Sequence, residues 1–166
     1  MKQFFAAAVC SAVIAAKPSS YPLSATVDGV KTTLYVQPTG WSSADVEEST
    51  VQYNYGNRMY LSTVDSVDTD KYFKPNMLGG TMEYDVDLSQ VGCGCDSAIY
   101  GVLMPAVDNE TDVQKYCDAN KVGGHWCPEF DVMEANKYAF RVTGHKCDAP
   151  DASGVYSNCD RSGSCT

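Results

Sequence analysis

Three carboxylates lie close together in residues 125–136, whose sequence is HWCPEFDVMEAN. Glu129, Asp131 and Glu134 fall within six positions of one another. Carboxylates held together repel each other, so one of them can keep a proton while its neighbour is ionised. Such a pair can perform acid–base or nucleophilic chemistry. The segment is therefore either part of an active site or an ordinary structural element that happens to be acidic.

The local pattern allows two structures for this segment. Pro128 followed by acidic residues suits the first turn of a helix, where proline is tolerated and acids favour the helix dipole. In a strand, Glu129 and Asp131 point to one face, about 7 Å apart. Glu134 then faces the other side unless a β-bulge lies between it and Asp131, and bulges are common beside active sites. Local pattern alone leaves both structures open.

The N-terminus predicts export. Residues 1–16, MKQFFAAAVCSAVIAA, have a basic start, a short uncharged apolar run and small residues at the end. This is the pattern of a secretory signal peptide, and the run is too short to span a bilayer. A buried apolar helix is the alternative. We expect cleavage after Ala15 or Ala16, a single domain over residues 17–166, a secreted protein and no membrane span.

The charge of the chain limits its partners. Without Lys2 the chain has 11 basic and 21 acidic residues, a formal charge of −10. Such a surface repels nucleic acid and anionic lipid, whereas a neutral polysaccharide is compatible with it. Solubility alone also explains the excess of acids. Asn109 begins a glycosylation sequon, which has meaning only in the secretory pathway.

Cysteine usage agrees with an oxidising compartment. Seven cysteines remain after the leader, an odd number, and they are predicted to form disulfides with at least one left over. Cys93 and Cys95, with His125 and His145, match no common zinc spacing. No metal and no cofactor are expected.

Most of the chain is predicted to form strands. Residues 30–37, 51–64, 81–89 and 97–105 are rich in β-branched and aromatic residues, and residues 81–89 alternate apolar and polar side chains. Turn-forming glycines and prolines separate them at the spacing of an antiparallel sandwich. Residues 148–166 are expected to be loops held by disulfides.

Residues 123–136, GGHWCPEFDVMEAN, resemble the active-site signature of glycoside hydrolase family 7, G-G-H-x-C-x-E-x-D-x-x-E-A-N. This family contains the cellobiohydrolases and endoglucanases that cleave β-1,4-glucan. Further matches extend over residues 56–165 in the family's order. They are GNRMYL at 56–61 with G-x-R-L-Y-L, YDVDLS at 84–89 with F-D-V-D-x-S, CGCDSAIY at 93–100 with C-G-x-x-x-A-L-Y, HKC at 145–147 with H-P-C, YS at 156–157, CD at 159–160, and GSC at 163–165 with D-G-C.

The resemblance implies roles for the three carboxylates. Glu129 would be the nucleophile, Glu134 the general acid/base, and Asp131 the carboxylate that orients and polarises Glu129. Retaining hydrolysis uses two carboxyl groups about 5 to 5.5 Å apart, one ionised and one protonated. The third carboxylate supplies repulsion that helps Glu134 hold its proton.

The resemblance also implies substrate contacts and disulfides. His145 would lie near the catalytic centre, and Tyr100 and Arg58 would contact sugars, although Tyr100 could be a core residue and Arg58 a surface ion pair. The implied disulfides are Cys117 with Cys127 and Cys147 with Cys159. A further family bridge has lost both ends, which leaves Lys121 and Trp126.

The fold implied is all-β, an antiparallel β-sandwich of the jelly-roll, concanavalin-like type. Family 7 domains are considerably longer, so the sandwich is expected to be incomplete, with an open cleft. Met133 stands where the family has a tryptophan, and only Trp41 and Trp126 remain for sugar stacking.

These features predict a secreted retaining β-1,4-glucanase of the cellulase type, whose partner is a β-glucan polysaccharide. The alternative is an inactive family 7 remnant that acts as a small secreted glycan-binding or surface protein. Intact carboxylates favour the enzyme, and the scarcity of stacking residues favours the remnant. The oligomeric state does not follow from the sequence.

Overall fold

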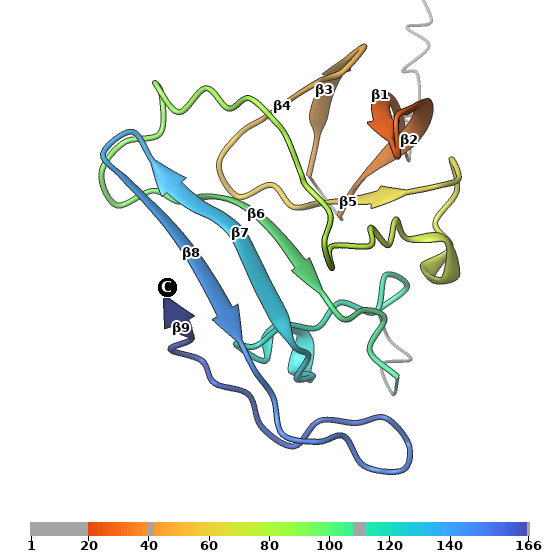
Figure 1. The fold of residues 1–166 in the computed structure, drawn as a ribbon, viewed down its shortest axis with the longest axis vertical. Helices are drawn as coiled ribbons and strands as arrows, with labels where there is room; N and C mark the ends of the chain where they lie inside the picture. Colours follow the sequence, from red (N-terminus) through yellow and green to blue (C-terminus); the bar gives the residue numbers. More distant parts are fainter. Residues whose placement is uncertain (1–19, 40–41, 108–111, 166) are drawn as a thin grey trace, which may run out of the picture.

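The structure, a computed structural model, describes residues 20–39, 42–107 and 112–165. These residues form nine strands and two short 3-10 helices, η1 (Thr69–Lys71) and η2 (Val122–Gly124), and no α-helix (Figure 1). The all-β class is therefore confirmed. Among the described residues no helix is long and apolar enough to cross a membrane. The predicted signal peptide and Asn109 lie outside the described residues.

The first sheet has the order β1-β2-β5, with all pairs antiparallel. Its strands are β1 (Tyr21–Val27), β2 (Val30–Pro38) and β5 (Met59–Ser62). Asp28 and Gly29 form the two-residue turn between β1 and β2, with φ of 50° and 77°. Positive φ at both positions suits an Asp-Gly hairpin turn, whose twist matches that of the strands. The strand predicted at residues 30–37 is confirmed as β2.

A separate two-stranded sheet is formed by β3 (Ala44–Glu47) and β4 (Thr50–Tyr53). The single strand predicted over residues 51–64 is wrong, because the chain turns between β4 and β5. Gly56 in this turn has φ of +78°, a conformation that favours glycine, and the neighbouring Tyr55 is 94% exposed.

The third sheet has the order β6-β7-β8-β9 and is antiparallel throughout. Its strands are β6 (Ser97–Val102), β7 (Glu129–Asn136), β8 (Ala139–His145) and β9 (Ser164–Cys165). The strand predicted at residues 97–105 ends early, at Val102, ahead of Pro105, which has no N–H to donate to a ladder. Residues 129–136 form the central strand β7, so the helical alternative for this segment is wrong.

The strand predicted at residues 81–89 is also wrong. These residues run as a coil, drawn in yellow-green in Figure 1, and pair with no described strand. Their apolar side chains find little cover, since Met82 is 41% and Val86 43% exposed. The alternation of the sequence is present, but without a neighbouring strand its backbone groups form no ladder.

The expected sandwich or jelly roll is not seen in the described residues, which form three small sheets. The consequence is visible on the third sheet. Its Phe130 and Phe140 are 47% and 60% exposed, because no second sheet of the described residues covers them. The buried apolar residues form small groups, such as Ala106 with Cys117 and Cys127. The tail from residue 148, predicted to be loops up to residue 166, runs as turns and loops as far as Gly163 and then forms the short strand β9 (Ser164–Cys165), so the prediction is confirmed only in part.

Candidate active site

A β-bulge brings the three carboxylates to one face of the third sheet. The pairing of β7 with β8 shifts register between Asp131 and Glu134. The pairs across these strands are Glu129 with His145, Asp131 with Thr143, and Glu134 with Arg141. Side chains directly opposite each other point to the same face, and residues 141, 143 and 145 of β8 share a face because they are two apart. The bulge expected from the strand interpretation is therefore confirmed.

Asp131 lies at the centre of this face and is only 4% exposed. Its Oδ2 is 3.0 Å from Nε2 of His145, and Nδ1 of His145 is 2.7 Å from the carbonyl oxygen of Asp160. A carbonyl oxygen only accepts, so Nδ1 carries a proton. One further proton is then shared between Nε2 and the Asp131 carboxylate.

The environment raises the pKa of both Asp131 and His145. Burial and the nearby Glu134 raise the pKa of Asp131, although His145 acts in the opposite direction. Burial lowers the pKa of His145, but the hydrogen bond to Asp160 and the charges of Asp131 and Glu129 outweigh it, and the net shift is upward. Both groups therefore hold protons more strongly than in water.

The turn before β9 presses against His145. Gly163 has φ of +67°, and a Cβ built there would lie 2.8 Å from Cε1 of His145 and would collide with Thr143. Glycine at this position therefore lets the chain approach the face closely enough for the Asp160 carbonyl to hold the imidazole.

Glu134 leans along the strand toward Asp131. Its Oε2 accepts a hydrogen bond of 2.9 Å from the hydroxyl of Thr143, which is the cross-strand partner of Asp131. The glutamate is half-buried. Its carboxyl group is thus held beside Asp131 rather than opposite its own partner, Arg141.

Glu129 is half-buried, and its carboxylate is held by a backbone group rather than by a side chain. Its Oε2 accepts a hydrogen bond of 3.0 Å from the backbone N–H of Ala119. Burial raises the pKa of Glu129, with smaller contributions from Asp131 and Asp118, whereas the Ala119 N–H favours the ionised form. A carboxylate nucleophile must be ionised, so the Ala119 N–H is the contact that favours the assigned role.

Tyr100 and Arg58 meet at a third residue, Tyr116. Tyr100 pairs with Asp131 from β6, and its hydroxyl is 3.2 Å from that of Tyr116. The guanidinium of Arg58 lies over the Tyr116 ring, 3.8 Å from its centre. Arg58 is thus linked to Tyr100 through Tyr116, and its guanidinium lies over an aromatic ring.

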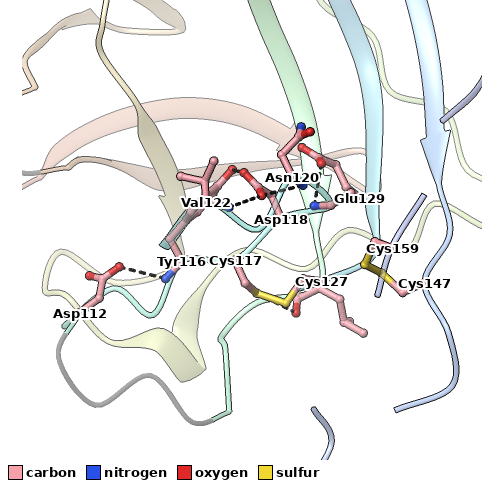
Figure 2. The surroundings of a disulfide bond; sticks show 12 residues. Asp112, Tyr116, Cys117, Asp118, Asn120, Val122, Cys127, Glu129, Cys147 and Cys159 are labelled. Carbon is pink, nitrogen blue, oxygen red and sulfur yellow. Dashed lines mark hydrogen bonds between the residues drawn. A yellow bond between two sulfur atoms is a disulfide. The ribbon is translucent and has the colours of Figure 1, made fainter. Parts of the chain in front are cut away.

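The structure contains both disulfides that the resemblance implies, Cys117–Cys127 and Cys147–Cys159 (Figure 2). Lys121 and Trp126 also lie together, with the ammonium 5.6 Å from the ring centre. Cys93 and Cys95 are exposed and unpaired.

Sequence reasoning missed several residues of this site. Asp118, Ala119 and Tyr116 belong to a loop, and Ala119 acts through its backbone, which leaves no side-chain signal. Thr143 would have been found if β8 had been predicted, because it lies two residues before His145 on the same face.

Two hollows lie beside the carboxylates rather than over them. One, of about 550 Å³, is lined by aromatic and apolar residues that include Leu103, Trp126 and Tyr156. The other, of about 370 Å³, is polar and is lined by Lys146, Asp160 and Arg161 among others. Neither lining includes Glu129, Asp131 or Glu134.

No family model matches the chain, and no solved structure matches it. Assignment to a family therefore depends on the motif residues and on how the strands place them.

Proposed function

We propose that this protein is a secreted retaining β-1,4-glucanase of the glycoside hydrolase family 7 type, which cleaves cellulose or a related β-glucan. One observation carries the proposal: the bulge in β7 keeps Glu129, Asp131 and Glu134 on one face although their sequence spacing would separate them. Three carboxylates on one face repel each other, and such an arrangement is costly unless function requires it.

The reaction would proceed in two displacements. A carboxylate oxygen of Glu129 attacks the anomeric carbon while the bond from that carbon to the leaving oxygen breaks, and Glu134 gives its proton to that oxygen. Water then attacks the same carbon and gives a proton to Glu134, and Glu129 leaves as a carboxylate.

The neighbouring residues support this chemistry. The Ala119 N–H stabilises the charge on Glu129, and Thr143 orients Glu134. Asp131, hydrogen-bonded to His145, would act on both glutamates through its charge. Tyr100, which pairs with Asp131 across the strands, would contact a sugar, and Arg58 would support it through Tyr116.

We also propose that the fold is a jelly-roll sandwich and that the protein is extracellular. The third sheet would be one half of the family's jelly-roll sandwich, and the exposed Phe130 and Phe140 are the side chains that a second sheet would cover. Two disulfides are compatible with an oxidising, extracellular setting.

The test is release of reducing sugar from soluble mixed-linkage β-glucan by the purified, oxidised chain. Wild type should release sugar, and Glu129→Gln should release none, since no other group is placed to form the glycosyl intermediate. Glu83→Gln is the matched control, because Glu83 is exposed and belongs to none of the three sheets. A folded wild-type chain without turnover on any β-glucan would refute the proposal.

Glycan binding without hydrolysis is the second candidate, favoured by the hollow that Trp126 and Tyr156 line beside the carboxylates. Aromatic rings stack on sugar faces, so this surface could hold a glucan without turnover. Retardation in a native gel that contains β-glucan, lost in Trp126→Ala and unaccompanied by sugar release, would favour this candidate over the enzyme.

A further inference from the structure

Asp118 organises the loop that faces Glu129 (Figure 2). Its carboxylate is only 4% exposed and accepts three hydrogen bonds. Oδ1 accepts from the backbone N–H groups of Asn120 and Val122, each at 2.9 Å, and Oδ2 accepts from the hydroxyl of Tyr116 at 2.8 Å. Burial raises the pKa of Tyr116, which keeps this phenol protonated as a donor.

The backbone of the same loop is fixed at its base. The disulfide joins Cys117 to Cys127, and the N–H of Cys127 donates to the carbonyl oxygen of Asp118 at 3.1 Å. The N–H groups of Asn120 and Val122 point inward to the Asp118 carboxylate. The N–H of Ala119, which lies between these anchors, points instead to Glu129.

We propose that Asp118 is a positioning residue for Glu129: its buried carboxylate fixes the 118–122 turn so that the Ala119 N–H stays aimed at Oε2 of Glu129. The inference rests on the proposed function, in which Glu129 is the nucleophile. A carboxylate suits this position better than an asparagine amide, because both of its oxygens accept. The amide has one N–H₂ group, which would face either the two backbone N–H groups or the phenol that donates to Oδ2.

A second aspartate in the chain forms the same turn without facing the site. Oδ1 of Asp151 accepts from the N–H groups of Ser153 and Val155, the same i+2 and i+4 positions, at 2.8 and 3.0 Å. Asp151 is exposed and lies in the loop closed by Cys147–Cys159. Asp151→Asn is therefore the matched control for Asp118→Asn.

The experiment measures the titration of Glu129 by NMR of ¹³C-labelled carboxyl carbons, together with the amide resonance of Ala119, in the oxidised full chain without substrate. In Asp118→Asn, loss of the aimed N–H should raise the midpoint of Glu129 by about one pH unit, a tenfold change in proton affinity. Removal of the Asp118 charge by itself would lower the midpoint, so the two effects differ in sign.

A raised midpoint and a shifted Ala119 amide in Asp118→Asn, with neither change in Asp151→Asn, are the expected results. A midpoint that is unchanged or lower in folded Asp118→Asn would overturn the inference. If that variant does not fold, Tyr116→Phe decides the question, because it removes one hydrogen bond and keeps the charge: a rise supports the inference and an unchanged midpoint overturns it.

These readouts do not depend on turnover. An inactive wild type would refute the proposed function and leave the titration result standing, whereas an active wild type with an unchanged titration in the variants would refute only the role of Asp118. Where activity is present, Asp118→Asn should lower kcat about tenfold and change KM less than about twofold, since the contact acts on the nucleophile rather than on substrate binding.

Discussion

Strand β7 and residues 81–89 both carry acids at alternate positions, and of the two only β7 forms a strand. β7 has a partner on each side, and its Asp131 and Met133 are 4% and 0% exposed. Residues 81–89 pair with no strand in the part of the chain that the structure describes, and Met82 and Val86 remain exposed. Alternation thus selects the side chains that can share a face, whereas neighbouring strands decide whether a sheet forms.

The same difference explains where the carboxylates lie. Each neighbour of β7 supplies side chains to the face that holds them, Tyr100 from β6 and Thr143 and His145 from β8. Residues 81–89 also hold alternate acids, Glu83, Asp85 and Asp87, but all three are exposed. Acids in both segments therefore permit matched substitutions, of which those in β7 should have the larger effects.

The largest difference is expected for activity. Glu134→Ala should lower turnover of natural β-glucan by about 10² to 10⁴-fold, because the leaving oxygen then receives no proton from a positioned acid. Glu83→Ala should leave turnover unchanged. An aryl glycoside whose leaving group needs no proton should still form the intermediate in Glu134→Ala, which a burst of released phenol would reveal.

Azide sharpens this test of the two glutamates. In Glu134→Ala the stalled intermediate should react with azide, a small anion that needs no general base, and give a β-glycosyl azide after two inversions. If rescue occurs in Glu129→Ala instead and gives the α-azide, the roles of the two glutamates are reversed.

Truncation of two methionines should change the free energy of unfolding by different amounts. Met133→Ala removes a fully buried side chain from β7 and should cost about 2–5 kcal/mol in the free energy of unfolding. Met82→Ala, in the exposed coil, should cost less than about 0.5 kcal/mol. Urea unfolding followed by fluorescence measures both. Equal costs would mean that residues 81–89 are packed as tightly as the central strand.

Much of the fold could be predicted where the determinants are local. β2 and the turn at Gly29 follow from residue types. In a strand at 129–136, the spacing of Glu134 meant that a bulge was needed for the three carboxylates to share a face, and the bulge is present. β1 was overlooked although Tyr21, Leu23, Ala25 and Val27 alternate and are half-buried. β3 gives little signal because it is only four residues long and holds two acids, Asp45 and Glu47.

The site was less predictable because its contacts are not local. The motif indicated Glu129, Asp131 and Glu134, and the resemblance indicated His145. The contact of Glu129 with the Ala119 backbone and that of His145 with the Asp160 carbonyl depend on how loops close, which no side-chain pattern encodes. The failed strand at 81–89 has the same origin, since pairing partners are distant in sequence.

The face of β7 that lies away from the carboxylates predicts self-association of the protein. Phe130 and Phe140 are opposite Gly144 and Ala135 on the face away from the carboxylates, and both are exposed. Uncovered apolar side chains favour contact with a second copy. Wild type should self-associate in sedimentation experiments, and Phe140→Lys should weaken association about tenfold, within the range for one buried aromatic. Tyr138→Lys, in the β7–β8 turn, is the control. A monodisperse wild-type monomer at high concentration would contradict this prediction.

The smallest effect is expected when the pH changes the free energy of unfolding. It acts through His145 and Asp131, the pair that joins β8 to β7. The pKa of His145 is raised above its ordinary value of 6.5, so the folded protein holds this proton more tightly than the unfolded chain. The contribution of this proton to the free energy of unfolding is fully present below pH 6.5, and it is lost as the pH rises through the folded-state pKa of His145. The raised pKa of Asp131 acts in the same direction over a window that begins near its ordinary value of 3.8. The free energy of unfolding should therefore fall as the pH rises above about 6.5, with a slope below about 1.4 kcal/mol per pH unit for one proton. His145→Gln should flatten this slope. An unchanged slope in His145→Gln would show that the imidazole does not carry the proton that links β7 to β8.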